Sequence, residues 1–318
     1  MQNQHETDIK NAAKRILIEK KADRVAGFTK GEFAYDPSPR VFYSAEEIEK
    51  NMIYDCFCSP NFSKFLVKET KKEGKIAVFM KPCDTYSLNQ LITEHKIDRE
   101  KIYVAGIGCS GMADVFKLRN KAEKAVLGAS CNNGIMTVKT PDGDIKFDFD
   151  EVTAERCLVC KSKKHVYYDE LLCDPCEETE TGRFDAVKKL EAMTEEQRYE
   201  FFRSELSRCI RCNACRDTCP ACTCETCVFD DRGSGAENKA ISNEFEEKLF
   251  HVIRAYHVAG RCTDCGECSR VCPQRIPLHL LNRKFIKDIN SFYGDYQAGE
   301  HIGQIPPLTD KKQDDPEV

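Results

Sequence analysis

The sequence has no long hydrophobic run. A membrane-spanning helix needs about 20 consecutive apolar residues, and no stretch of this chain approaches that length. Residues 1–15 also lack the basic start, the apolar segment and the small-residue cleavage site of a secretory signal. We therefore expect a soluble, cytoplasmic protein with no membrane span.

Positive charge is not in excess either. The 48 Lys and Arg residues are outnumbered by 53 Asp and Glu residues, so the formal net charge is −5. Proteins that bind nucleic acid usually present a basic surface to the phosphates. Nucleic acid is therefore not an expected partner.

Clear signals for nucleotides and for histidine-bound metals are also missing. Gly106-Ile-Gly108 alone is too weak a pattern for us to assign a phosphate-binding loop. The 7 histidines are scattered and show no metal-binding spacing. Neither feature predicts a ligand.

Cysteine, in contrast, is abundant. Twenty of the 318 residues are cysteine, and many of them stand in short spacings. Thiols held close together in a reducing cytosol bind metal more often than they form disulfides. The sequence therefore predicts zinc or iron–sulfur sites in a chain long enough for two domains.

Two segments carry the same cysteine run. Residues 209–220 (the first run) and 262–273 (the second run) both match C-x2-C-x2-C-x3-C-P, the run of bacterial two-cluster ferredoxins. In such a run three thiolates bind one 4Fe-4S cluster and the fourth, followed by proline, binds the other. The predicted ligands are Cys209, Cys212, Cys215 and Cys272 for one cluster (the first set) and Cys262, Cys265, Cys268 and Cys219 for the other (the second set). Two zinc knuckles are the alternative, but they need only CxxC pairs.

The N-terminal part has the pattern of an α/β domain. Residues 75–80 and 101–107 are apolar runs typical of strands, and residues 84–95 between them have helical spacing. A right-handed crossover makes the two strands parallel, so their carboxyl ends lie at the same edge of the sheet. Cys83 and Cys109 follow these two ends.

The remaining segments complete the predicted organisation. Residues 134–149 predict a β-hairpin, because a Pro-Asp-Gly turn separates two alternating segments. Residues 160–190 are charged and irregular, and we place the domain boundary near 180–193. Residues 194–206 begin with a Thr-x-x-Gln capping box, and residues 243–259 have the pattern of an amphipathic helix that starts at Asn243. The predicted fold is an α/β N-terminal domain with a partly parallel sheet (1–190), a mostly α-helical dicluster ferredoxin domain (191–290) and a C-terminal tail (291–318).

Four further thiols are candidates for a third site. Cys83 and Cys109 from the strand ends, with the pair Cys157 and Cys160 after the hairpin (the N-terminal set), could hold another 4Fe-4S cluster. Scattered cysteines are also often just buried small residues. A zinc site of the form CxxC-x12-CxxC is a further alternative, made by Cys157, Cys160, Cys173 and Cys176.

The motifs in this region resemble a known family. Lys81-Pro-Cys-Asp84, Gly106-Ile-Gly-Cys-Ser-Gly-Met112 and Arg156-Cys-Leu-Val-Cys160, followed by the two runs, are similar to the beta subunits of deazaflavin-coenzyme-reducing hydrogenases and formate dehydrogenases. The resemblance covers residues 45–285. It is closer to fused forms with a C-terminal dicluster ferredoxin, as in sulfhydrogenases and anaerobic sulfite reductases. It implies a 4Fe-4S cluster on the N-terminal set, with FAD beside it.

Other cysteines have less defined roles. Cys222, Cys224 and Cys227 follow the first run and either surround a cluster, capture another metal or pack as small buried residues. Cys56 and Cys58 are expected to border the N-terminal site. Cys131 has no evident partner in the sequence.

Two clusters held close together serve to pass single electrons between larger redox centres. The sequence therefore predicts an iron–sulfur electron-transfer subunit of a cytoplasmic anaerobic oxidoreductase complex of the hydrogenase, formate dehydrogenase or heterodisulfide-reductase type. Other redox subunits would be its partners, and we assign no catalytic residue. The alternative is a self-sufficient flavin and iron–sulfur enzyme that acts on a nicotinamide or deazaflavin coenzyme. A zinc-stabilised scaffold without redox activity is a third hypothesis.

Overall fold

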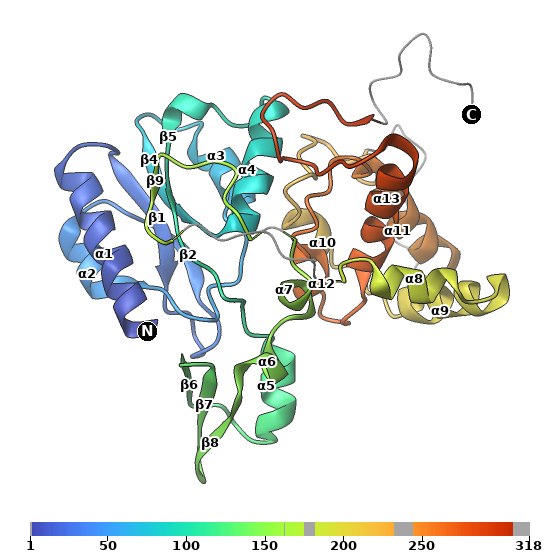
Figure 1. The fold of residues 1–318 in the computed structure, drawn as a ribbon, viewed down its shortest axis with the longest axis horizontal. Helices are drawn as coiled ribbons and strands as arrows, with labels where there is room; N and C mark the ends of the chain where they lie inside the picture. Colours follow the sequence, from blue (N-terminus) through green and yellow to red (C-terminus); the bar gives the residue numbers. More distant parts are fainter. Residues whose placement is uncertain (1, 162, 175–181, 232–243, 308–318) are drawn as a thin grey trace. The chain divides into compact units, whose positions relative to one another are not determined.

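The computed structural model describes residues 2–161, 163–174, 182–231 and 244–307. The chain divides into two compact units, one made of residues 1–85 and 97–181 and the other of residues 86–96 and 182–318. The first unit is an α/β structure and the second is helical (Figure 1), which confirms the predicted fold class. In the part of the chain that the structure describes, no helix has the length and apolar character needed to cross a membrane.

A six-stranded sheet forms the centre of the first unit. Its path is β2-β1-β4-β5-β9, and β3 pairs with β1. The pairs β1–β4, β4–β5 and β5–β9 are parallel, whereas β2 and β3 run antiparallel to β1. The strands are β1 (Arg24–Thr29), β2 (Ser38–Phe42), β3 (Met52–Ile53), β4 (Ile76–Met80), β5 (Ile102–Gly106) and β9 (Glu170–Leu171). Every residue of β4 is buried, as expected for a continuous apolar run inside a parallel sheet.

The predicted strand–helix–strand unit is present. Helix α4 (Pro82–Thr93) lies between β4 and β5 in the chain, and the two strands pair in parallel with Met80 opposite Gly106. Cys83 and Cys109 each stand three residues after these paired positions. Strand β9 lies within residues 160–190, which were predicted to be irregular. These residues form a strand because they pair with β5 and extend the sheet.

Helices surround this sheet. Helix α1 (Gln2–Ile18) contacts α2 (Ala45–Asn51) and strands β1 and β4, and the two helices lie side by side in Figure 1. The other helices of this unit are α3 (Ser63–Glu69), the 3-10 helix η1 (Arg99–Lys101), α5 (Val115–Ala122), α6 (Phe149–Val152) and α7 (Glu155–Leu158).

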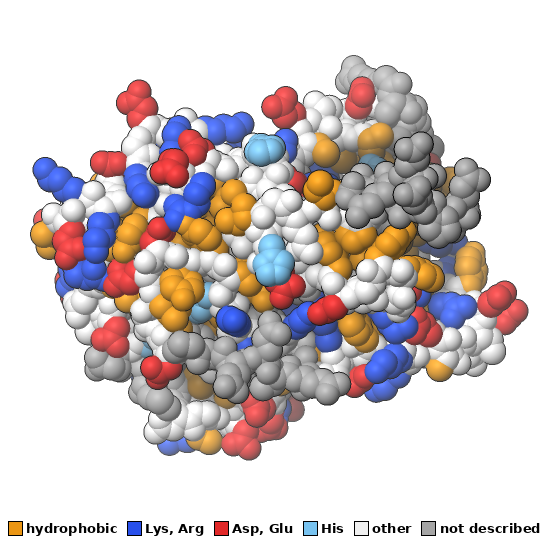
Figure 2. Space-filling view, turned by 45° about the horizontal axis from the view of Figure 1, so that its top comes forward, with side chains coloured by type: hydrophobic (Ala, Val, Ile, Leu, Met, Phe, Trp, Pro, Cys, Tyr) orange, Lys and Arg blue, Asp and Glu red, His pale blue; other side chains and the backbone are white. Residues whose placement is uncertain are grey.

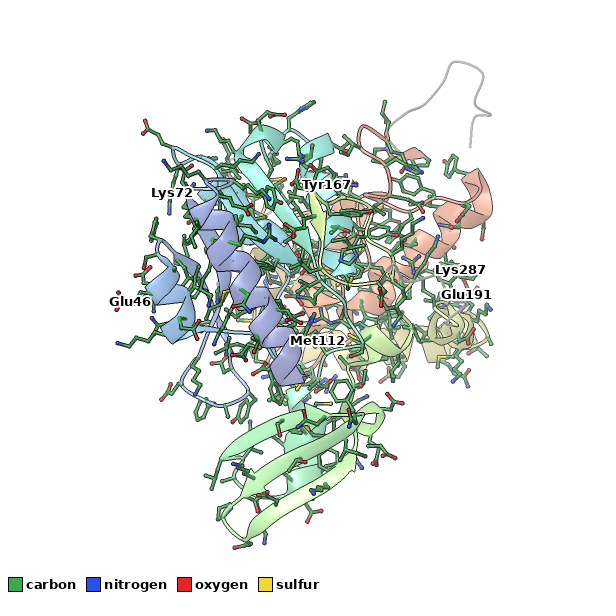
Figure 3. All side chains as sticks on the ribbon, turned by 60° about the vertical axis from the view of Figure 1, so that its left-hand side comes forward. Glu46, Lys72, Met112, Tyr167, Glu191 and Lys287 are labelled. Atoms are coloured by element: carbon green, nitrogen blue, oxygen red, sulfur yellow. The ribbon has the colours of Figure 1, made fainter. Side chains whose placement is uncertain are left out.

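The first unit also contains a separate three-stranded antiparallel sheet, seen in Figure 3. Its strands are β6 (Gly128–Asn132), β7 (Ile135–Thr140) and β8 (Gly143–Asp148). Strands β7 and β8 form the predicted hairpin, with Thr140 opposite Gly143. Met136 and Val138 point into a core with Phe149 and Leu118, so one face of this sheet is buried.

The second unit is built from helices. They are α8 (Asp185–Glu191), α9 (Glu195–Ser207), α10 (Ala214–Asp217), α11 (Glu244–His257), α12 (Glu267–Arg270) and α13 (Leu278–Tyr293). The predicted amphipathic helix is α11, although its expected start, Asn243, lies outside the described residues. Lys287 of α13 donates to the Glu191 carboxylate of α8 at 3.0 Å, and Figure 3 shows the two residues beside each other.

Charged side chains of both signs are mixed on the face drawn in Figure 2. Lys and Arg are interspersed there with Asp and Glu, in keeping with a net charge of −5.

Replacing Thr194 with alanine is expected to lower the free energy of unfolding by about 1 kcal/mol. The Thr194 hydroxyl accepts the N–H of Gln197 at 3.2 Å, and the Gln197 side chain accepts the N–H of Thr194 at 3.0 Å. Alanine removes the first of these bonds at the start of α9. Urea denaturation followed by circular dichroism measures the change. The control, Ser204→Ala on an exposed position of the same helix, should change stability by less than about 0.5 kcal/mol.

Candidate metal centres

The two cysteine runs fold into loops of the same shape. Arg211 and Asp264, each two residues after the first cysteine of their run, have left-handed backbones with φ of 54° and 59°. Two residues later, Asn213 and Gly266 are also left-handed and begin the one-turn helices α10 and α12. Residues other than glycine adopt this conformation at a cost in free energy. Its repetition at the same positions indicates that both loops need this backbone shape.

A small cavity lies at the first run. Its walls include Cys209, Cys212 and Cys215 from the first run and Cys272 from the second. The structure thus brings the first set together. Burial raises the pKa of the Cys209 thiol to about 11, so this sulfur stays protonated at neutral pH unless a metal ion binds it.

The surroundings of His251, on α11, indicate whether this cavity suits a cluster. Its ring lines the cavity, and the residue is only 2% exposed. Within the described parts of the chain, neither ring nitrogen has a hydrogen-bond partner. Burial, and then the charge of Arg254, lower the pKa of His251 to about 3, so the ring is neutral and carries one N–H donor. A buried donor without an acceptor is unfavourable, and the sulfurs of a cluster would supply acceptors. The residues present therefore fit an iron–sulfur cluster.

The second set also lies together. Cys219, from the first run, is close enough to Cys262, Cys265 and Cys268 to interact electrostatically with each of them. Burial raises the pKa of the Cys268 thiol to about 12. Each run therefore contributes three thiols to one set and one thiol to the other, which is the exchange that the spacing predicts. Their role as ligands stays a prediction.

Backbone N–H groups point at sulfurs of the first set. The N–H of Arg211 donates to Cys209 Sγ at 3.4 Å, and the N–H of Ile276 donates to Cys272 Sγ at 3.4 Å. Hydrogen bonds to ligand sulfurs stabilise the more negative, reduced form of a cluster. If the first set holds a cluster, these donors would raise its reduction potential.

The N-terminal set gathers at the carboxyl edge of the parallel strands. Cys83 lies in the first turn of α4, Cys109 follows β5, Cys157 lies in α7 and Cys160 comes just after it. Cys83 interacts electrostatically with Cys160 and Cys109, and Cys109 interacts with Cys157 and Cys160. Burial raises the pKa of the Cys109 thiol to about 11. The structure brings these four thiols near one another, and their binding of a cluster stays a prediction.

A buried ion pair beside this set was missed in the sequence. The Nζ of Lys81 lies 2.9 Å from the Asp84 carboxylate, and both side chains are almost fully buried. The same Nζ donates to the carbonyl oxygens of Cys58 and Pro60 at 3.1 and 3.2 Å. Burial lowers the pKa of Lys81, but the Asp84 carboxylate and the nearby Cys83 and Cys109 together outweigh burial and raise this pKa to about 12. The available signal was a basic and an acidic residue on either side of Pro82-Cys83.

The glycines of residues 106–111 have the G-x-G-x-x-G spacing of dinucleotide-binding loops. The sequence-based prediction considered only Gly106-Ile-Gly108 and missed the full spacing. Such a loop opens directly into a helix, whereas the next helix, α5, begins only at Val115. A Cβ atom on Gly108 would lie 3.2 Å from the Cβ of Cys173. Close packing therefore explains this glycine, and no nucleotide is assigned to the loop.

The alternative zinc site is described only in part. Cys173 lies beside Gly108, but Cys176 lies outside the described residues. Among the residues that are described, no group of three or more His, Cys, Asp or Glu side chains is arranged to hold a single metal ion.

The remaining cysteines divide between the two units. Cys56 and Cys58 are buried in the first unit, with Cys58 Sγ 3.6 Å from the Asp55 carboxylate, and Cys131 lies in β6. Cys222 interacts electrostatically with Arg254 in the second unit. None of these contacts assigns a ligand role.

Three kinds of comparison with known proteins give matches. Residues 205–276 match the model of a 4Fe-4S dicluster domain. The chain is 26% identical to the F420-dependent formate dehydrogenase subunit beta of Methanocaldococcus jannaschii, over 93% of this chain and 92% of that protein. It is 24% identical to the F420-dependent formate dehydrogenase 1 subunit beta of Methanococcus maripaludis, over 92% of each chain. Among solved structures, it is similar to the F420-reducing nickel–iron hydrogenase complex from Methanosarcina barkeri, with a TM-score of 0.37 and 16% identity over 49% of this chain and 59% of that chain.

Proposed function

We propose that this chain is an iron–sulfur electron-transfer subunit. Its homologues are beta subunits of F420-dependent formate dehydrogenases, and its residues 205–276 match a 4Fe-4S dicluster domain. The observation that carries the proposal is the exchange of Cys219 and Cys272 between the two runs. This exchange is the ligand pattern of two-cluster ferredoxins. The partners would be the other redox subunits of a cytoplasmic formate dehydrogenase complex.

The second unit supplies a protected path for single electrons. When bound, 4Fe-4S clusters accept and release one electron each. The first and second sets would hold them, and the burial of Cys215, Cys268 and Cys272 keeps water away from the sulfurs. The N–H groups of Arg211 and Ile276 would stabilise the added negative charge. Because the two sets exchange a thiol, the electron has only a short distance to cross.

The first unit would hold the third cluster on the N-terminal set. The mutual interactions of these thiols support that role, as does the buried positive charge of Lys81 beside them. FAD beside this cluster, and F420 as the coenzyme, are further parts of the proposal, supported by the F420 dependence in the names of the two relatives.

The same names favour a second candidate function. The isolated chain would then be a self-sufficient flavin enzyme that exchanges electrons with a soluble deazaflavin or nicotinamide coenzyme. Stoichiometric FAD and reduction of the coenzyme by the chain without partners would support it. FAD-free protein without this activity would leave the electron-transfer role alone.

Metal and flavin analysis of the anaerobically purified chain tests the proposal. We expect about twelve iron atoms, an equal amount of acid-labile sulfide and no zinc, because three cubane clusters contain four irons each. About eight irons with one zinc would assign Cys157, Cys160, Cys173 and Cys176 to zinc and contradict the third cluster. A colourless protein with zinc and no iron would contradict electron transfer itself and favour a scaffold.

A further inference from the structure

Arg254 is a buried charge that faces both the first and the second set. It lies on α11, the helix between the two runs, and is only 6% exposed. Its Nη2 donates to the backbone carbonyl of Cys215, in the first set, at 2.8 Å. The guanidinium is also close enough to Cys219 and Cys268 to interact electrostatically with both. Since Cys219 and Cys268 belong to the second set, the guanidinium interacts with both sets.

The residues that the structure describes provide little compensation for this charge. Among them, no carboxylate forms an ion pair with Arg254, and its Nε has no hydrogen-bond partner. An uncompensated buried cation is unfavourable. A 4Fe-4S cluster with four thiolates is negatively charged overall, because the thiolates outweigh the positive charge of the core. Two clusters would therefore supply the missing counter-charge.

We propose that the guanidinium of Arg254 is a fixed positive charge, shared by both C-terminal clusters, that raises the reduction potential of each. This inference rests on the proposed function. Each reduction transfers one electron from a partner redox subunit to a cluster, which becomes more negative by one charge. No proton moves, because the guanidinium stays protonated throughout. A fixed cation stabilises the reduced form more than the oxidised form, and does so most strongly where water is excluded.

The test is a redox titration of the full-length chain followed by electron paramagnetic resonance. The two cluster signals are assigned with the single variants Cys212→Ser and Cys265→Ser. At a fixed solution potential, Arg254→Gln should lower the ratio of reduced to oxidised cluster about tenfold at both clusters, a shift of about 59 mV for one electron. Arg254→Lys, which keeps the charge, should stay within about threefold of the unmodified chain. Lys248→Gln removes a charge from the same helix, where Lys248 reaches the Tyr199 hydroxyl at an exposed position, and should leave both ratios unchanged.

Each result has a defined meaning. Arg254→Gln with full iron content and unchanged potentials would overturn the inference, and so would a shift at one cluster alone. If Arg254→Gln fails to hold iron but Arg254→Lys holds it at potentials near those of the unmodified chain, the loss follows the charge and supports the inference. Loss of iron from both variants, or potentials lowered at both clusters in Arg254→Lys, would contradict it. An unmodified chain without iron would instead contradict the proposed function, which iron analysis detects before any titration.

Discussion

Replacing Cys265 with serine is expected to remove about four iron atoms per chain and to leave the cluster of the first set in place. Cys265 lies in the second set, where it interacts electrostatically with Cys219 and Cys262. A serine hydroxyl is a much poorer ligand than a thiolate for the iron of such a cluster. Iron and labile-sulfide analysis, together with loss of one paramagnetic signal, measures the change.

Two further substitutions sharpen this prediction. Cys219→Ser lies in the first run but should remove the second cluster, whereas Cys272→Ser lies in the second run but should remove the first. The matched control is Cys131→Ser in β6, which should retain all the iron. Full iron content in Cys265→Ser would contradict the assignment of the second set.

Replacing Asp264 with asparagine is expected to lower the free energy of unfolding of the second unit by about 3 to 5 kcal/mol. Its carboxylate accepts the Nε–H of Arg183 at 2.7 Å and the Nε–H of Arg283 at 3.0 Å. Arg183 is 8% exposed and Arg283 is 1% exposed, and in the described part of the chain the Asp264 carboxylate pairs with both of these buried cations. Asparagine has almost the same shape and tolerates the left-handed backbone, so the variant isolates the loss of charge.

Chemical denaturation of the full chain under anaerobic conditions measures this effect. The control is Asp217→Asn, because Asp217 pairs with Arg216 at 3.3 Å through a side chain that is 67% exposed. An exposed pair of this kind contributes less than about 1 kcal/mol. Equal effects of the two substitutions would show that the buried network of Asp264 does not stabilise the second run.

Local spacing predicted the parts of the site that depend on short stretches of chain. The C-x2-C-x2-C-x3-C-P runs anticipated that Cys272 would join the first set, because cluster geometry dictates the spacing. The apolar runs before Cys83 and Cys109 placed both thiols at one sheet edge, since parallel strands end on the same side.

Features that depend on packing between distant segments were not predicted. Strand β9 is only two residues long and exists because it pairs with β5, so it leaves no hydrophobic pattern of its own. Arg254 sits among ordinary charged residues of α11, and only the folded structure shows that it faces cysteines from both runs. Charge and helical periodicity cannot distinguish such a buried arginine from a solvated one.

The exchange of Cys219 and Cys272 also limits how this part of the protein can be divided. A fragment that ended before residue 262 would keep three thiols of the first set. It would also keep Cys219, but the other three thiols of the second set would be missing. If the two sets bind clusters as predicted, neither half could be transplanted alone with a complete set of ligands. The smallest portable unit is therefore the whole pair of runs together with the helix between them.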